Sequence, residues 1–265
     1  MKKGHARKGA RLGQHFLTGT WAATSLVKAT GMKAGDTVLE IGPGKGALTK
    51  EILKTGAHVV AIEKDEALTE LLAAIFAKEI LDKRLVIIKG DVRDLQPATI
   101  GLRAGKYILA ANIPYYITGE IIRQFLSCNV QPHTMAILIQ KEVAERIIAR
   151  DGKESILSIA VKVYGDPRIF AKVSRGNFSP PPSVDSAILA VTNISKSSFD
   201  ELSEKLFFKV LRAGFAAKRK LLASNLGNVF GREKVDAAFE ICKIHTKTRA
   251  EDLKLEDWLG LTSQL

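Results

Sequence analysis

The chain has 265 residues, 46% of them hydrophobic, and its 40 Lys and Arg side chains outnumber its 28 Asp and Glu side chains, which gives a net charge of +12. This length can bury the core of one large domain and one small domain. The positive charge indicates a polyanionic partner, with nucleic acid as the first choice and an anionic membrane surface as the second. The two cysteines, Cys128 and Cys242, form neither a disulfide framework nor a metal-binding spacing.

No apolar run reaches the roughly 20 residues that cross a bilayer. The basic first residues lack the apolar core and cleavage site of a secretory signal. We therefore expect a cytoplasmic protein with reduced thiols. Residues 1–12 form a basic arm that either binds a polyanion or remains a solvated tail, and charge alone does not decide between the two. Its basic side chains are Lys2, Lys3, Arg7, Lys8 and Arg11.

Strand and helix patterns alternate through the first half of the chain. Apolar, β-branched runs predict strands at residues 37–41, 58–62, 85–88, 107–110 and 134–139. Helical spacing of apolar residues predicts helices at residues 47–54, 66–76 and 120–126. This alternation predicts βαβ units, and thus an α/β fold with a parallel sheet that is covered on both faces.

The pattern changes after about residue 142. A charged amphipathic helix is expected at 142–150, whereas 156–163 fits a buried helix or a buried strand equally well. A proline-rich turn then leads into a strand within 178–192, and the polar stretch 193–198 is typical of a linker. Helical patterns follow at 199–213, 219–226, 234–241 and 255–261. We therefore expect an α/β domain over residues 1–193 and a small helical domain over residues 194–265.

A glycine-rich turn, "VLEIGPGKGALTK" at residues 38–50, follows the first of these strands. Gly42 and Gly44 would let a ligand approach the backbone closely, at the edge of the sheet where open α/β folds bind ligands. The spacing differs from the G-x-G-x-x-G of dinucleotide sites, which disfavours a nicotinamide enzyme. Glu63 and Asp91 end the next two strands, where they could accept hydrogen bonds from ribose hydroxyls and from an adenine amino group.

The fourth strand runs into "ANIPYYIT" at residues 111–118. The Asn112 side-chain oxygen can accept a hydrogen bond from an exocyclic amine on a base, which helps to free the lone pair of that amine. Pro114 removes a backbone donor and stiffens the turn. Tyr115 offers a face on which a base can stack, once the base has left its helix or if it is already unpaired. These residue types together favour a site that holds a flat base and makes its exocyclic amine more nucleophilic.

The motifs "EIGPG", "IEKD", "GD" and "NIPY" occur in the order found in adenine-N6 methyltransferases. Together with "GQHFL" (13–17), "FSPPPSVDSAIL" (178–189), "AKRKLLASNLGN" (217–228) and "RAEDLKLEDW" (249–258), they resemble the ribosomal RNA adenine dimethyltransferase family, in particular its bacterial small-subunit branch. The resemblance covers essentially the whole chain. The chain departs from the family pattern at 153–158, where a Tyr-Gly pair is missing, and at Ala217, where many relatives carry a basic or polar residue.

The resemblance implies a Rossmann-like, seven-stranded class I methyltransferase sheet and a helical C-terminal domain that contacts RNA. It implies S-adenosylmethionine as the cofactor, no metal, and a monomer. The implied reaction dimethylates N6 of two adjacent adenosines in a hairpin loop near the 3′ end of 16S rRNA, within an immature small ribosomal subunit.

The same resemblance implies a role for each site residue. Asn112, Pro114, Tyr115 and Phe178 would form the catalytic site, with Tyr115 and Phe178 on opposite sides of the target adenine. The cofactor would be bound by His15, Leu17, Gly42, Gly44, Glu63, Asp91 and Asn112.

Four other functions compete with this one. A large-subunit ribosomal RNA dimethyltransferase shares "NIPY" but not the "PPPSVDSA" and "RAEDL" stretches. A DNA adenine methyltransferase usually has Asp in place of Asn112, and a cytosine-C5 enzyme needs a cysteine after a proline, which neither Cys128 nor Cys242 provides. A binding protein without catalysis would not need Glu63, Asp91 and the 112–115 motif to be intact.

Overall fold

The computed structural model describes residues 15–265, so the basic arm at residues 1–12 and the start of "GQHFL" lie outside the described residues. The described chain forms two compact units. The first comprises the chain up to Ala144 together with Asp166–Ile194, and the second comprises Glu145–Gly165 together with Ser195–Leu265. The expected boundary near residue 193 therefore lies next to one of the observed divisions, but residues 145–165 belong with the helical unit.

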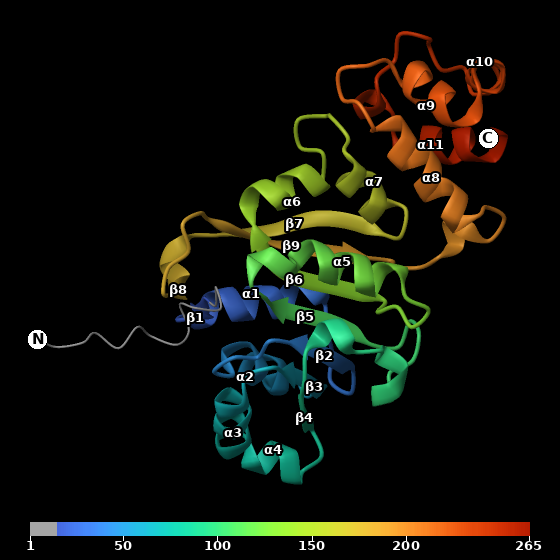
Figure 1. Cartoon of the computed structure of the whole chain (residues 1–265). Helices are drawn as coiled ribbons and strands as arrows, with labels where there is room; N and C mark the ends of the chain where they lie inside the picture. The colour runs from blue at the N-terminus through green and yellow to red at the C-terminus, as the bar shows by residue number, and fades with distance from the viewer. Residues whose placement is uncertain (1–14) are drawn as a thin grey trace, which may run out of the picture. The chain divides into compact units, whose positions relative to one another are not determined.

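The first unit is built on a seven-stranded sheet with the order β4-β3-β2-β5-β6-β9-β7 (Figure 1). All neighbouring strands run parallel except for β9, which is antiparallel to both β6 and β7. The strands are β2 (Thr37–Ile41), β3 (His58–Glu63), β4 (Leu85–Lys89), β5 (Ile108–Asn112), β6 (Thr134–Gln140), β7 (Asp166–Val173) and β9 (Ser186–Thr192). This arrangement confirms the class I methyltransferase sheet.

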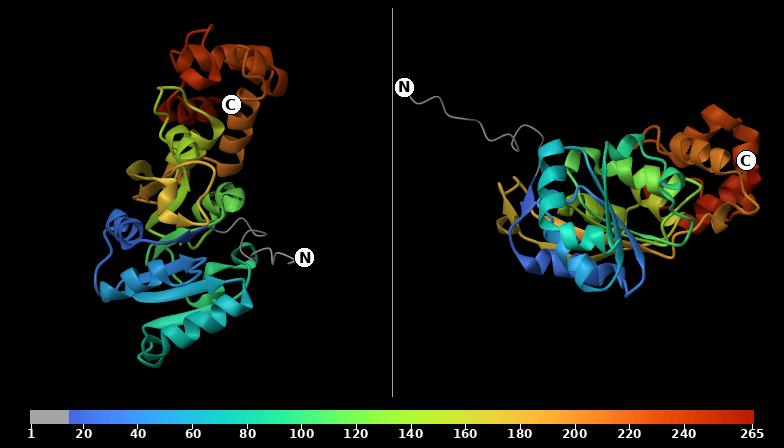
Figure 2. Two further views of the ribbon diagram at one scale, coloured as in Figure 1. Left: turned by 90° about the vertical axis from the view of Figure 1, so that its left-hand side faces the viewer. Right: turned by 90° about the horizontal axis from the view of Figure 1, so that it is seen from below.

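Helices cover both faces of the sheet (Figure 2). One face packs against α1 (Thr20–Thr30), α2 (Ala47–Lys54) and α3 (Glu66–Ile75), whose Leu26, Ile52 and Leu72 share one buried cluster with strand residues such as Ala110 and Leu138. The amphipathic α5 (Thr118–Ser127) buries Phe125 and its neighbouring isoleucines. The central strands are almost continuously apolar because neither of their faces meets water.

A short second sheet joins two distant segments of the first unit. β1 (Phe16–Leu17) pairs antiparallel with β8 (Phe178–Ser179), so Phe16 lies opposite Ser179 and Leu17 opposite Phe178. The backbone N–H of Thr18 adds a bond to the carbonyl of Asn177 at 3.0 Å. The described part of "GQHFL" is thereby held against the start of the "FSPPP" segment.

The second unit consists of helices around a small aromatic core. α8 (Glu204–Gly214) and α11 (Leu255–Gln264) contribute the fully buried Phe207 and Trp258. The other helices are α7 (Ile156–Lys162), α9 (Leu222–Phe230) and α10 (Arg232–Ile241). None of the helices among residues 15–265 has the length and apolar character needed to cross a membrane.

The segment that lacks the family's Tyr-Gly pair forms the start of α7. The Ser155 hydroxyl accepts from the N–H of Ser158, and the Ser158 hydroxyl accepts from the N–H of Ser155 at 2.7 Å, which is a reciprocal cap. Glu154 is buried and accepts a hydrogen bond from Lys162 Nζ at 2.7 Å. The ambiguous stretch at 156–163 is therefore a helix, and its capped start defines the conformation of 153–158.

Candidate active site

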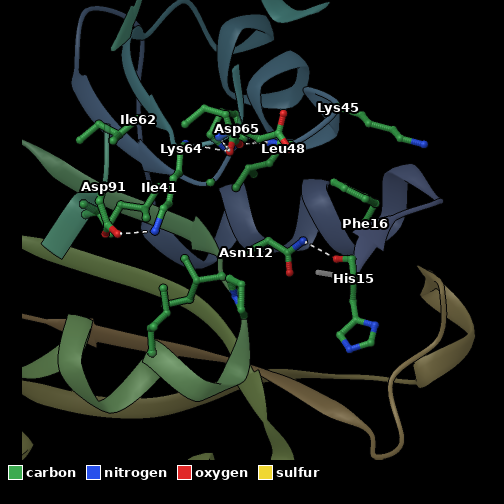
Figure 3. A pocket seen from close by; sticks show the side chains of 18 of the residues that line it. His15, Phe16, Ile41, Lys45, Leu48, Ile62, Lys64, Asp65, Asp91 and Asn112 are labelled. Atoms are coloured by element: carbon green, nitrogen blue, oxygen red, sulfur yellow. Dashed lines mark hydrogen bonds and ion pairs between the residues drawn. The ribbon is translucent and has the colours of Figure 1, made fainter. Parts of the chain in front are cut away.

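A cavity of about 360 Å³ opens at the carboxyl ends of β2, β3 and β5 and beside the start of β1 (Figure 3). Its walls come from the glycine-rich turn, from the residues that follow β3 and β4, and from the 112–117 turn. Eight of the predicted site residues line it: His15, Leu17, Gly42, Gly44, Glu63, Asp91, Asn112 and Pro114. Tyr115 and Phe178 do not belong to its lining.

The glycine-rich turn packs closely against the ring of Phe16 at Gly44. A Cβ atom there would lie 3.0 Å from the ring of Phe16, and both Gly42 and Gly44 have positive φ, at 66° and 59°. Lys45 places its Nζ 5.1 Å from the centre of the same Phe16 ring. The turn is therefore covered on one side by the β1 strap, which we define as residues 15–18.

Glu63 is 3% exposed, and three backbone N–H groups hold its carboxylate in one orientation. Oε1 accepts from Lys64 at 2.9 Å and from Asp65 at 3.0 Å, and Oε2 accepts from Gly44 at 3.1 Å. Each oxygen of an ionised carboxylate has about two acceptor sites. One acceptor site, on Oε2, therefore remains for a hydroxyl group of a ligand.

Asp91 forms ion pairs with two basic side chains of the cavity, Arg93 and Lys64. Arg93 donates to both of its oxygens, from Nε at 2.9 Å and from an Nη at 2.6 Å, and Lys64 adds a third contact at 2.9 Å. The hydrogen bonds from Arg93, followed by those from Lys64, hold the pKa of Asp91 well below its usual range. An amino group that donates to Asp91 would have to share this carboxylate with two cations.

Asn112 ends β5, and its side chain is oriented by the backbone of the strap. Its Nδ2 donates to the carbonyl oxygen of His15 at 3.1 Å (Figure 3). Because the amide nitrogen is placed by this bond, Oδ1 points the other way and has no hydrogen-bond partner among residues 15–265. The bond to His15 thus turns the oxygen of Asn112, an acceptor, toward the open side of the site.

Tyr115 and Phe178 contact the strap but do not line the cavity. The Tyr115 hydroxyl and the Ser186 hydroxyl are 2.6 Å apart, and burial raises the pKa of Tyr115. The ring of Tyr115 lies 5.8 Å from the ring of His15. Phe178 is 4% exposed and belongs to the core cluster beneath α1. The two rings predicted to flank a base thus differ in accessibility.

Glu40, which precedes the first glycine of the turn, is fully buried, and only Thr49 approaches its carboxylate as a hydrogen-bond donor among the described residues, without good bond geometry. Burial raises the pKa of Glu40 to about 8; Thr49, through its side chain and its backbone, opposes this shift, and the negative charge of Glu63 adds to it. The raised pKa favours the neutral form of this carboxyl group at pH 7.

Several cavity residues are not among the predicted site residues, and they include Lys64, Arg93 and Tyr116. Arg93 follows Asp91 by two residues, within reach of a two-pronged contact, but charged neighbours are too common for this spacing to be diagnostic. Tyr116 is 71% exposed, unlike the adjacent Tyr115. Within residues 15–265 there is no group of three or more His, Cys, Asp and Glu side chains that could hold a metal ion.

A family model described as "Ribosomal RNA adenine dimethylase" matches residues 5–265. The chain belongs to this family. The match confirms the resemblance drawn from the motifs, and it makes the protein an enzyme that dimethylates adenine in ribosomal RNA.

Curated relatives agree with this membership. Ribosomal RNA small subunit methyltransferase A of Dehalococcoides mccartyi (strain CBDB1) is 40% identical over 258 residues, which cover 97% of this chain and 87% of the relative. The protein of the same name from Clostridioides difficile (strain 630) is 34% identical, and the match covers 95% of this chain and 89% of the relative.

Solved structures share the fold. A dimethyladenosine transferase from Plasmodium falciparum superposes with a TM-score of 0.79 at 26% identity, covering 93% of this chain and 96% of that structure. The 23S rRNA methyltransferase ErmE superposes with a TM-score of 0.76 at 22% identity, covering 94% of this chain and 99% of that structure. At this identity the second likeness concerns the fold alone.

Proposed function

We propose that this enzyme transfers methyl groups from S-adenosylmethionine to N6 of two adjacent adenosines in the hairpin loop near the 3′ end of 16S rRNA. The substrate would be an immature small ribosomal subunit in the cytoplasm, and the enzyme would act as a monomer. The names of the relatives from Dehalococcoides mccartyi and Clostridioides difficile support the small subunit as the target. The observation that carries the chemistry is the convergence of Glu63, Asp91 and Asn112 on one cavity.

The cavity fits S-adenosylmethionine in size and in the order of its polar groups. A volume of about 360 Å³ lies within the usual range for small-molecule sites. Glu63 would accept a ribose hydroxyl at the acceptor site that remains on Oε2, Asp91 would accept from the adenine amino group, and Gly42 and Gly44 would leave room for the methionine part. When bound, this cofactor supplies a methyl group that is already activated on a positively charged sulfur.

The residues around Asn112 would mainly orient the target amine. Oδ1 of Asn112 can accept one N–H of the amine, because its Nδ2 is engaged by the carbonyl of His15. Accepting this bond helps to localise the nitrogen lone pair, and Pro114 keeps the turn stiff. Alignment in a site that excludes water accounts for most of the rate enhancement that such a reaction requires. No metal and no strong general base are needed in this scheme.

We propose that Tyr115 provides one stacking face for the flipped adenine and that Phe178 provides the other. Stacking on one aromatic ring contributes about 1–3 kcal/mol per base, and the base must first leave its stack. The hydroxyl of Tyr115 is fixed by Ser186. The ring of Phe178 is buried, so the entering base would have to displace atoms that now cover it.

The helical second unit is our candidate for the main RNA contact. Lys218, Arg219 and Lys220 all belong to the exposed connection between α8 and α9. Basic side chains there can neutralise RNA phosphates and release counterions. The basic arm at residues 1–12 would add to the same attraction.

The proposal is tested by Asn112→Ala. This variant should retain most of its affinity for the cofactor, measured by calorimetry, while it loses most methyl transfer to unmethylated small subunits. Both assays are needed, because a misfolded variant would lose binding as well. Dimethylation near the wild-type rate would refute the role assigned to Asn112.

A further inference from the structure

The side chain of His15 faces away from the cavity that this residue lines. In Figure 3 its imidazole ring points away from the other labelled side chains. Its Nδ1 lies 2.7 Å from the carbonyl oxygen of Pro180, in the segment that follows Phe178. A carbonyl can only accept, so Nδ1 must carry the proton and donate. The ring is therefore engaged with the "FSPPP" segment.

The same residue contacts two other members of the site. Its carbonyl accepts from the Asn112 side chain at 3.1 Å, and its ring lies 5.8 Å from the ring of Tyr115, tilted by 31°. His15 thus touches the amide that would orient the amine, the ring that would stack on the base, and the segment that carries Phe178. Among the site residues it alone joins all three.

The strap needs such a bond because its own pairing is short. β1 and β8 have two residues each, and isolated pairs of strands are marginal in water even at greater length. The hydrogen bond from His15 to Pro180 adds one contact to this pairing, next to the proposed site of the target base between Tyr115 and Phe178. It joins residues 165 positions apart in the chain.

We propose that His15 is a positioning residue whose side chain holds segment 178–180 at the base site and does not bind the cofactor. The inference rests on the proposed function, because it takes Tyr115 and Phe178 as the walls around the target adenine. The backbone carbonyl of His15 orients Asn112 independently of the side chain. A substitution at His15 should therefore disturb the base-side wall while it leaves the orientation of Asn112 intact.

Two substitutions at His15 test whether its role depends on the hydrogen bond to Pro180 or only on the bulk of the side chain. The amide nitrogen of Asn lies at about the same distance from Cα as Nδ1 of His, so His15→Asn keeps the donor. His15→Ala removes it. Each variant would be compared with the wild-type protein in methyl transfer to unmethylated small subunits, in calorimetric affinity for S-adenosylhomocysteine, and in hydrogen exchange of the peptide covering 174–190.

We expect His15→Ala to lower the rate of transfer at saturating cofactor by roughly tenfold or more, since small misplacements of reacting groups are costly. Its affinity for S-adenosylhomocysteine should stay within about threefold of wild type, as expected if the side chain does not contact the cofactor. The amides of Phe178 and Ser179 should exchange faster. His15→Asn should keep both the rate of transfer and the slow hydrogen exchange of these amides close to those of the wild-type protein.

The inference is overturned if His15→Ala weakens S-adenosylhomocysteine binding and leaves the rate at saturating cofactor unchanged. It is equally overturned if His15→Asn is as impaired as His15→Ala, or if exchange in 174–190 does not change. Failure of the proposed function looks different: the wild-type protein itself would transfer no methyl group to small subunits. The exchange comparison would still decide whether His15 holds the segment.

Discussion

The side chain of Asn112 donates from Nδ2 to the main-chain carbonyl of His15 across 3.1 Å, and this bond decides which end of the amide faces the open side of the site. A carboxylate could not make the bond, because it has no proton to donate at neutral pH. Both oxygens of such a carboxylate would instead repel the carbonyl. The difference between an amide and an acid at position 112 therefore matters for orientation as well as for charge.

Asn112→Asp should lower methyl transfer by about 100-fold, because a displacement on the order of 1 Å at the reacting atoms has that effect. This loss is expected although DNA adenine methyltransferases usually carry Asp at the head of the motif. The measurement is single-turnover transfer to small subunits at saturating cofactor, with cofactor affinity determined in parallel. An Asp variant as active as wild type would mean that the bond to His15 does not orient the side chain.

The buried Glu40 should make stability depend on pH in an unusual direction. Its pKa is 4.5 in the absence of interactions and about 8 in the fold. The folded state therefore binds the proton more tightly. The proton on Glu40 stabilises the folded state fully below pH 4.5. This stabilisation declines as the pH rises and is lost above about pH 8. Raising the pH through this window should destabilise the fold.

Glu40→Gln should remove this dependence, since Gln cannot ionise. The free energy of unfolding of the variant, relative to wild type, should rise between pH 4.5 and pH 8.5 by on the order of 4 kcal/mol, at about 1.4 kcal/mol per pKa unit. Urea denaturation at several pH values measures this difference. The same substitution at Glu70, which is exposed on α3, controls for the exchange of Glu for Gln. If the free energy of unfolding of Glu40→Gln differs from that of wild type by the same amount at every pH, the account is contradicted.

Two glycines with the same backbone conformation allow packing to be separated from strain. Gly46 has φ +81°, and a Cβ there would lie 2.5 Å from the ring of Phe76; Gly101 has φ +80° and nothing within 4 Å of its Cβ position. Gly101→Ala should cost about 1–2 kcal/mol through the left-handed backbone alone. Gly46→Ala should cost a further 1–3 kcal/mol or so, because its Cβ overpacks the core. If the two variants lose the same free energy of unfolding in thermal or urea denaturation, the ring of Phe76 moves aside without an energetic cost.

A double-mutant cycle can measure how much the hydrogen bond between Tyr115 and Ser186 contributes to stability. Tyr115→Phe and Ser186→Ala should each cost about 1 kcal/mol of stability, and the double variant should cost little more than either, since one bond is lost in all three. Tyr115→Phe keeps the ring and should keep most of the methyl transfer. Tyr115→Ala removes the stacking face and should raise the KM for small subunits. Fully additive losses of stability would indicate that the two hydroxyls are not coupled.

The sequence predicted the strands that are defined by local runs of apolar residues. The run at 37–41 coincides with β2, and the helix at 47–54 coincides with α2. It did not predict β7 or α1. β7 alternates exposed and half-buried residues, as an edge strand does, and contains Pro167. α1 buries small residues such as Ala22 and Ala23. Neither segment therefore carries a strong local signal.

The site was predictable as a set of residues but not as a set of contacts. Glu63, Asp91 and Asn112 each end or follow a parallel strand, and the geometry of such a sheet brings these ends to one edge. The bonds from Asn112 to His15 and from His15 to Pro180 span 97 and 165 residues. No periodicity or local motif specifies such pairings, because they depend on how β1 and β8 meet.

The most direct test is the identity of the methylated nucleoside. Small subunits that lack the modification would be incubated with the wild-type enzyme and S-adenosylmethionine carrying a labelled methyl group, and their RNA would then be digested to nucleosides. We predict label in N6,N6-dimethyladenosine from 16S rRNA, and its loss with Asn112→Ala. Label in another nucleoside, label in large-subunit RNA only, or an unchanged yield with Asn112→Ala would contradict the account.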